Sequence, residues 1–215
     1  MTLEHLILLR HGETDWNAGF RLQGHRDITL NGLGLEQADA AAPSVAALQP
    51  DVIVSSDLQR AWRTAAPVAA LTGLPLSTDR RLRETSLGEW EGLTRQEVTD
   101  GWPGMWDQWR SSSADFAPPG GESRSRVAER AYGVVTDLDR GSHRRALLVA
   151  HGGLIVGLTG KLLGLPSALW SVLTGVSNCH WVVMHRAAET WRLHSYNAGL
   201  GSVVLPGGED EVAGV

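Results

Sequence analysis

Three short apolar runs, separated by longer segments with helical periodicity, constrain the fold of this chain more than any other feature. Residues 5–10 read HLILLR, residues 51–55 read DVIVS and residues 146–150 read ALLVA. Short runs that are mostly apolar are typical of strands buried on both faces of a sheet. Because these strands alternate with helices, the sequence predicts an α/β sandwich with a mostly parallel sheet.

The segments between the runs predict helices with recognisable start signals. Thr29 can cap a helical stretch that reaches about residue 48, although Pro43 should kink or break it. Thr94 can cap another helix, with Glu97 in the capping-box position. Further helices are expected over residues 58–71, 122–140 and 152–163, and a hairpin is expected over residues 181–184 and 190–194.

Residues 85–123 look like a helical insertion that could form a lid over a ligand site. Within it, Trp102, Trp106 and Trp109 recur at helical spacing, which predicts one aromatic helix face. Residues 111–123 are rich in Ser, Pro and Gly, which predicts irregular structure at the end of the lid.

The length and composition of the chain fit one domain over residues 1–205, followed by a disordered acidic tail over residues 206–215. A net charge of -5 disfavours nucleic acid as a partner, so an anionic ligand would need a local cluster of Arg. Cys179 is the one cysteine, which excludes an intramolecular disulfide. Without a visible secretory signal or an apolar run long enough to span a bilayer, we expect a cytoplasmic protein with no membrane partner.

The predicted strands bring chemically active residues to one edge of the sheet. Ligands of parallel sheets bind beyond the carboxyl ends of the strands. Arg10 and His11 follow the first run, Ser56 follows the second and His151 follows the third. Arg60 lies in the first turn of the helix after the second run. The sequence therefore predicts a site at this edge.

Arg10 and Arg60 together predict that the ligand is an anion. A guanidinium group is a planar fork that binds phosphate oxygens in pairs and neutralises charge that develops during transfer. Taken singly, each Arg is more often a solvated surface residue. Their joint position beside two His-Gly turns reverses that preference.

His11 and His151 are each followed by Gly, which allows the backbone to approach a ligand closely. A neutral imidazole is a competent nucleophile, and nearby Arg residues favour the neutral form. A lone His is more often a structural hydrogen-bonding residue, but two His-Gly turns after matched strands indicate a role in the site. The chain has no HExxH motif, no second Cys and no phosphate loop of the GxGxxG or GxxxxGK[ST] type. We expect no metal and no cofactor, which favours His11 as a nucleophile.

Hydrolysis of a phosphate ester also needs a proton donor for the leaving oxygen. Glu84 is the leading candidate, and it should be partly desolvated so that its pKa rises towards the working pH. Nearby competitors are Glu13, Glu89 and Glu91. Asn17 and Gln23 could donate side-chain hydrogen bonds to phosphate, although each alone is more often an ordinary loop residue.

Taken together, the motifs resemble the histidine phosphatase superfamily, which includes the cofactor-dependent phosphoglycerate mutases. The run LRHGET at residues 9–14, followed by Trp16-Asn17 and Leu22-Gln23-Gly24, looks like its signature. Four further segments match in order: SSDLQRA from residue 55 with Thr64-Ala65, LRE from residue 82 with Gly88 and Glu91-Gly92, PGGES from residue 119 and AHGG from residue 150. The resemblance spans residues 3–202 and implies a three-layer α/β/α sandwich.

The resemblance implies a role for each matching residue. His11 would accept the phosphoryl group and form a phosphohistidine, which water then hydrolyses. Glu84 would protonate the leaving group and then help to activate water. The implied phosphate pocket consists of Arg10, Arg60 and His151, with Asn17, Gln23, Gly24 and Gly152 as further binding residues. No metal is implied.

The acid loop at residues 82–92, LRETSLGEWEG, resembles the phosphatase branch, because mutases usually carry an Asn-Glu-Arg version and a longer insertion. This implies a metal-independent phosphomonoesterase that acts on a small phosphorylated metabolite of phosphosugar or phosphoglycerate type. A cofactor-dependent phosphoglycerate mutase and a non-enzymatic phospholigand-binding protein stay open as alternatives. By analogy with relatives, the partner protein would be a second copy in a homodimer.

The tryptophans of the lid allow two interpretations. The Trp-rich insertion and the segment GESR at residues 121–124 are similar to actinobacterial glucosyl-3-phosphoglycerate phosphatases. In that interpretation Trp16, Trp90, Trp106 and Trp109 would form an apolar rim that suits the face of a sugar. The alternative is that the three tryptophans at helical spacing form a buried helix face.

Overall fold

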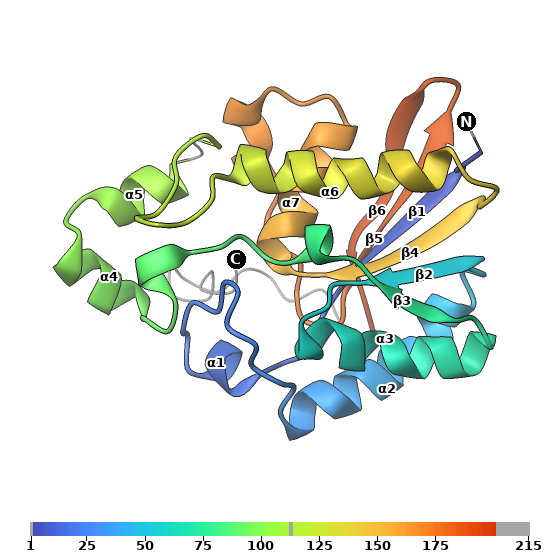
Figure 1. The fold of residues 1–215 in the computed structure, drawn as a ribbon, viewed down its shortest axis with the longest axis horizontal. Coiled ribbons are helices and arrows are strands. Elements are labelled where there is room, and N and C mark those ends of the chain that lie inside the picture. Colours follow the sequence, from blue (N-terminus) through green and yellow to red (C-terminus); the bar gives the residue numbers. More distant parts are fainter. Residues whose placement is uncertain (1, 112–113, 201–215) are drawn as a thin grey trace.

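A six-stranded sheet forms the centre of the protein in its computed structural model, which describes residues 2–111 and 114–200 (Figure 1). The strands are β1 (His5–Arg10), β2 (Val52–Ser55), β3 (Leu76–Thr78), β4 (Arg145–Ala150), β5 (Trp181–Ala187) and β6 (Thr190–Ala198), in the spatial order β3-β2-β4-β1-β5-β6. The neighbours among β1 to β4 pair in parallel, whereas β5 is antiparallel to β1 and β6. The predicted strands and the hairpin are confirmed. The sequence analysis missed β3, which has three residues, two of them exposed.

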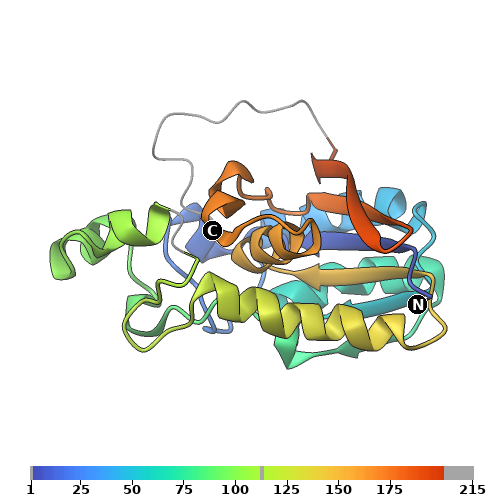
Figure 2. The same cartoon turned by 90° about the horizontal axis from the view of Figure 1, so that it is seen from above.

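Helices cover both faces of the sheet, which confirms the α/β/α sandwich (Figures 1 and 2). One layer consists of α2 (Gly32–Ala46) and α3 (Gln59–Thr72), and the other consists of α6 (Arg124–Asp139) and α7 (Gly152–Leu162). Side chains of β1 alternate between the two cores: Leu6 and Leu8 pack with α6 and α7, while Ile7 packs with α2 and α3. This alternation follows from the two-residue period of a strand. Two short 3-10 helices, η1 (Arg80–Leu82) and η3 (Ser167–Val172), lie in the connections.

The first long helix differs from the prediction at both of its expected signals. The N-cap of α2 is Asn31 rather than Thr29, and the Asn31 side chain accepts a hydrogen bond from the N–H of Gly34 at 2.8 Å. Pro43 lies inside α2 without ending it, and the N–H of Ala47 still bonds to the Pro43 carbonyl at 3.0 Å. The alanine-rich face of α2 is buried against the sheet, and this packing outweighs the one hydrogen bond that proline removes.

The predicted lid insertion at residues 85–123, called the lid below, contains η2 (Gly88–Trp90), α4 (Arg95–Gly101) and α5 (Met105–Arg110). The capping box of Thr94 and Glu97 at the start of α4 is confirmed. The prediction that Trp102, Trp106 and Trp109 form one helix face is wrong, because α4 ends before Trp102 and α5 begins after Gly104. Pro103 and two glycines at this point interrupt the helix.

The lid tryptophans nevertheless gather in one buried cluster around Trp90. Ring centroids of Trp102, Trp106, Trp109 and Phe116 lie 6.0 to 6.4 Å from the Trp90 ring. Trp90 is fully buried, and Trp106 and Trp109 are buried as well. The rim interpretation is therefore wrong for these three side chains. They are the core of the lid, since indole rings contribute most when they are buried together.

The strand ends that matter for function are aligned by the register of the sheet. Arg10 lies opposite Ala150, and Ser55 lies opposite Val149, so the chain leaves β1, β2 and β4 at one edge. In the described part of the chain, no helix is both long and apolar enough to cross a membrane. The predicted acidic tail lies outside the described residues.

Candidate active site

Five predicted site residues come together as buried side chains at the aligned strand ends: Arg10, His11, Arg60, Glu84 and His151. The rings of His11 and His151 have centroids 5.1 Å apart. The two histidines follow β1 and β4, while the guanidinium of Arg60 reaches the site from the first turn of α3. These residues are far apart in the sequence, so the parallel sheet is what brings them together.

The protonation of His11 follows from its surroundings. Its Nδ1 lies 2.7 Å from the carbonyl oxygen of Gly12, which can only accept, so Nδ1 carries the hydrogen and Nε2 keeps its lone pair. Burial lowers the pKa of His11 well below its ordinary value, and the charges of Arg60 and Arg10 lower it further. His11 is therefore neutral at pH 7, with its free lone pair on Nε2.

The turn after β1 holds His11 through its backbone. A Cβ on Gly12 would lie 2.4 Å from the carbonyl oxygen of Gly34, so only glycine fits between β1 and the start of α2. The N–H of Gly12 donates to the Thr64 hydroxyl at 3.0 Å, and the side-chain amide of Asn178 donates to the His11 carbonyl at 2.9 Å. Thr64 belongs to a segment that resembles the superfamily, but the sequence analysis assigned it no role, and it gave no signal for Asn178.

Arg60 orients His151 through a direct hydrogen bond. The Nε of Arg60 donates to Nδ1 of His151 at 3.2 Å, which places the hydrogen of the neutral imidazole on Nε2. The two terminal nitrogens donate to the carbonyls of Arg26 and Gly24 at 2.7 and 2.8 Å. Gly24 has a φ of +49°, and its carbonyl role makes it a support for Arg60. Each terminal nitrogen of Arg60 carries two N–H bonds, and the hydrogen bonds to Arg26 and Gly24 use only one of them.

Three buried polar atoms at the site lack a hydrogen-bond partner among the described residues: Nε of Arg10, Oε1 of Gln23 and Nε2 of His151. Arg10 also donates from Nη1 to the carbonyl of Val176 at 2.6 Å, which fixes its guanidinium in place. Unpaired buried polar groups are costly, so a ligand is expected to satisfy them. The two nitrogens are donors, which suits an anion.

The carboxylate of Glu84 lies at the N-terminus of α7, the helix that begins directly after His151. Its carboxylate accepts hydrogen bonds from the N–H groups of Thr85, Gly153 and Leu154 at 2.8, 3.0 and 3.1 Å. The side chain is only 9% exposed, so the expected partial desolvation is confirmed. Gly152 is the first residue of α7 and is itself buried. The helix N-terminus favours a negative group at this point.

The competing carboxylates have other partners or positions. Glu13 accepts a hydrogen bond from the Asn31 side chain, and Glu91 accepts one from the N–H of His25 at 2.9 Å. Glu89 is exposed. Asn17 uses its side-chain oxygen in the capping box of α1 (Asp15–Ala18). That arrangement leaves its Nδ2 as a donor for a ligand.

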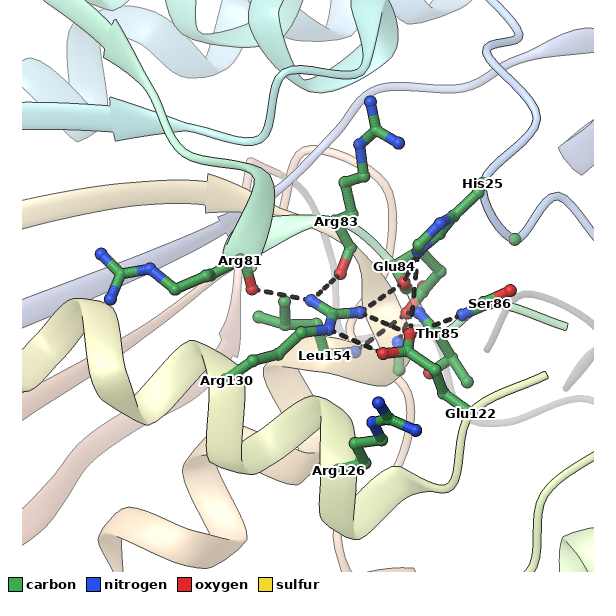
Figure 3. A network of polar contacts seen from close by, with 12 residues as sticks. His25, Arg81, Arg83, Glu84, Thr85, Ser86, Glu122, Arg126, Arg130 and Leu154 are labelled. Carbon is green, nitrogen blue, oxygen red and sulfur yellow. Dashed lines mark hydrogen bonds and ion pairs between the residues drawn. The ribbon is translucent and has the colours of Figure 1, made fainter.

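Arg130 holds the loop that carries Glu84, and Figure 3 shows it at the centre of a polar network. It donates to the backbone carbonyls of Arg81, Arg83 and Glu84 at 2.7, 2.6 and 2.7 Å. Its guanidinium also pairs with Glu122, whose carboxylate accepts from the N–H of Ser86 at 3.0 Å. The acid loop is thus bound to α6 on both sides of Glu84.

The sequence analysis missed Arg130, although a signal was present. Arg130 shares a helix face with the buried residues Val127 and Val134, at spacings of three and four residues. A charged residue on a core-facing stripe needs a specific set of partners. Here the partners are the carbonyls of the acid loop.

The comparisons with known proteins agree with this geometry. The family model of the histidine phosphatase superfamily (branch 1) matches residues 6–199. The chain belongs to this superfamily. The predicted enzyme class, a histidine phosphatase, is thereby confirmed.

Among the described residues, no group of three or more His, Cys, Asp or Glu side chains is arranged to hold a metal ion.

Several relatives within the superfamily cover most of the chain. A glucosyl-3-phosphoglycerate phosphatase of Mycolicibacterium vanbaalenii is 46% identical over 217 residues, which cover 92% of this chain and 96% of the relative. A solved structure of mycobacterial glucosyl-3-phosphoglycerate phosphatase with VO3 has a TM-score of 0.88 and 45% identity, covering 91% of this chain and 100% of that chain. A Salmonella paratyphi C protein named "Probable phosphoglycerate mutase GpmB" is 37% identical over 165 residues, 75% of this chain and 76% of the relative.

Replacing Arg130 with methionine is expected to lower kcat of this histidine phosphatase by about 10- to 100-fold, because a small displacement of a catalytic group has effects of that size. The pH profile of kcat should change as well, since the acid loop that Arg130 holds carries Glu84. Arg140→Met on an exposed residue at the end of the same helix is the matched control. An unchanged kcat and pH profile in a folded Arg130→Met variant would contradict a positioning role for Arg130.

Proposed function

We propose that this histidine phosphatase hydrolyses the phosphate monoester of a glycosylated phosphoglycerate, with glucosyl-3-phosphoglycerate as the leading substrate. The observation that carries the chemistry is the fixed tautomer of His11, which keeps the lone pair on Nε2. The His11 ring lies beside His151, and the charges of Arg60 and Arg10 act on it. The names of the relatives with 43 to 46% identity support the choice of substrate.

In the proposed first step, Nε2 of His11 attacks the phosphorus atom and the bond from phosphorus to the leaving oxygen breaks. Arg10, Arg60 and His151 donate hydrogen bonds to the phosphoryl oxygens, where negative charge develops. The proposed mechanism requires that Glu84 carries a proton when the substrate is bound. Glu84 gives this proton to the leaving oxygen, which departs as an alcohol.

In the second step, the Glu84 carboxylate takes a proton from water while the water oxygen attacks the phosphohistidine. The bond between nitrogen and phosphorus breaks and its electron pair returns to Nε2 of His11. Phosphate leaves, and Glu84 is again protonated. Asn17 and Gln23 are proposed as additional donors or acceptors for the phosphate, with Gly24 and Gly152 shaping the pocket through their backbones.

The substrate is tested by comparing kcat/KM across glucosyl-3-phosphoglycerate, simple phosphosugars, nucleotides and 3-phosphoglycerate. We expect the highest value for the glycosylated phosphoglycerate, with free phosphate as the product. Isomerisation of 3-phosphoglycerate in place of phosphate release would favour the mutase alternative, to which the 37% identical relative gives some support. Hydrolysis of any ester excludes the non-enzymatic alternative.

A homodimer and a cytoplasmic location stay predictions. A groove of about 770 Å³ between α2 and α3 is lined by Leu35, Trp62 and Leu71, and these three apolar side chains are exposed. An exposed apolar patch of this kind is typical of a protein interface. A second copy is the partner we propose for it, and sedimentation of the purified protein measures whether it forms.

A further inference from the structure

Two half-buried arginines in the lid region have no acidic partner among the described residues. They are Arg110, at the C-terminal end of α5, and Arg124, the first residue of α6. By contrast, Arg83 of the acid loop and Arg130 of α6 are paired with carboxylates, while Arg126 of α6 is exposed to solvent. A partly desolvated charge without a counter-ion is unfavourable, so its presence calls for a function.

The fold places Arg124 beside the catalytic edge. Helix α6 leads into β4, so the two elements run in opposite directions and α6 begins near the carboxyl ends of the strands (Figures 1 and 2). The guanidinium of Arg124 lies over the ring of Trp109, 4.6 Å from its centroid. Next to it, the N–H of Ser125 donates to the carbonyl of Ala114 at 2.8 Å, which ties the start of α6 to the end of the lid.

The charge of Arg124 interacts with the charges of both Arg110 and Glu84. Burial and the positive charge of Arg110 lower the pKa of Arg124 to about 10, whereas the carboxylate of Glu84 raises it. Burial also lowers the pKa of Arg110, with a smaller effect from Arg95. Both guanidinium groups remain charged at pH 7, and they repel each other. An anion bound between them would remove the repulsion and supply the missing counter-charge.

The position of Arg124 relative to Glu84 indicates which part of the substrate supplies this anion. In the proposed mechanism, Glu84 protonates the leaving oxygen, so the leaving group lies on the Glu84 side of the phosphate. In a 3-phosphoglycerate unit, the carboxylate is separated from that oxygen by only two carbon atoms. The carboxylate of the substrate therefore lies near Glu84, whose charge also acts on Arg124.

We propose that Arg124, assisted by Arg110, binds the carboxylate of the phosphoglycerate unit and thereby selects acidic phosphate esters over neutral ones. This inference rests on the proposed function and adds the residues that recognise the leaving group. Arg124 supplies the planar fork, which matches the two oxygens of a carboxylate. Trp109 supports it from below through its ring face. Because Trp109 belongs to the lid core, the subsite joins the lid to the body of the enzyme.

The test compares two substrates with the same ester and different acidity, 3-phosphoglycerate and glycerol 3-phosphate. Arg124→Gln is expected to lower kcat/KM for 3-phosphoglycerate by about 10- to 100-fold, as for a charge-assisted hydrogen bond, and to change glycerol 3-phosphate less than about twofold. The loss should appear mainly in KM, and Arg124→Lys should recover part of it. Arg126→Gln, on an exposed residue of the same helix, should change neither value.

An equal loss for both substrates would overturn the proposal, because it would mean that Arg124 acts through the packing of the lid. An unchanged kcat/KM for both would overturn it as well. Binding of 3-phosphoglycerate, measured by calorimetry in wild type and Arg124→Gln, reads the subsite without turnover. If the wild type hydrolysed no ester yet bound 3-phosphoglycerate through Arg124, the proposed function would fail and the subsite would stand.

Discussion

Replacing His11 with alanine is expected to lower kcat for phosphate ester hydrolysis by at least about 10⁴-fold, while leaving the protein folded. The size follows from other enzymes that lose a nucleophile and keep only the electrostatic part of catalysis. The remaining Arg10, Arg60 and His151 can still bind phosphate, so KM should change far less than kcat. Inorganic phosphate should bind to the variant, because the variant has lost a nucleophile and kept its donors.

The same variant tests the intermediate. Rapid quenching of the wild type with a labelled ester should trap phosphate on the protein in a linkage that is stable to base and labile to acid. His11→Ala should trap none. His194→Ala, on an exposed histidine of β6, is the control and should keep normal trapping and turnover. Normal turnover in His11→Ala would exclude nucleophilic catalysis by His11.

Replacing Glu84 with glutamine is expected to produce the second large effect, and the effect should depend on the leaving group. An alkyl phosphate needs a proton on its leaving oxygen, so kcat should fall by about 10²- to 10⁴-fold. An ester with an acidic phenol as leaving group needs no such proton, so its loss should be much smaller. Glutamine has almost the same shape, and its amide oxygen can still accept the N–H groups of Thr85 and Leu154.

The measurement is kcat for a series of esters whose leaving groups differ in acidity. The wild type should show a shallow dependence on leaving-group pKa, and Glu84→Gln should show a steep one. Glu89→Gln, on the exposed glutamate of the same loop, is the matched control and should behave as the wild type. Parallel dependences in the wild type and Glu84→Gln would show that another group protonates the leaving oxygen.

Much of the site could be predicted because its residues sit where buried strands end. Arg10, His11 and His151 follow apolar runs, and a parallel sheet aligns such ends whatever the connecting segments are. The helix signals were less secure. Asn31 displaced Thr29 as the cap of α2, and packing against the sheet carried the helix past Pro43.

Supports of the site were harder to predict, because each depends on a contact between distant segments. Arg130 acts on backbone carbonyls 46 to 49 residues away, and a carbonyl has no sequence signature. Asn178 reaches the carbonyl of His11 from 167 residues away. The burial of Trp90 and its neighbours also depended on how η2, α4 and α5 fold onto one another.

The sequence by itself determined the class of fold and the chemical elements of the site, because strand burial, helix periodicity and the His-Gly and Arg motifs are local patterns. Only the tertiary structure decided the tautomers of His11 and His151, the three N–H donors around Glu84 and the unpaired charges of Arg110 and Arg124. The physical reason is that a proton position, a desolvated carboxylate and a missing counter-ion are properties of surroundings. Those surroundings are assembled from segments that meet only when the sheet and its two helical layers have formed.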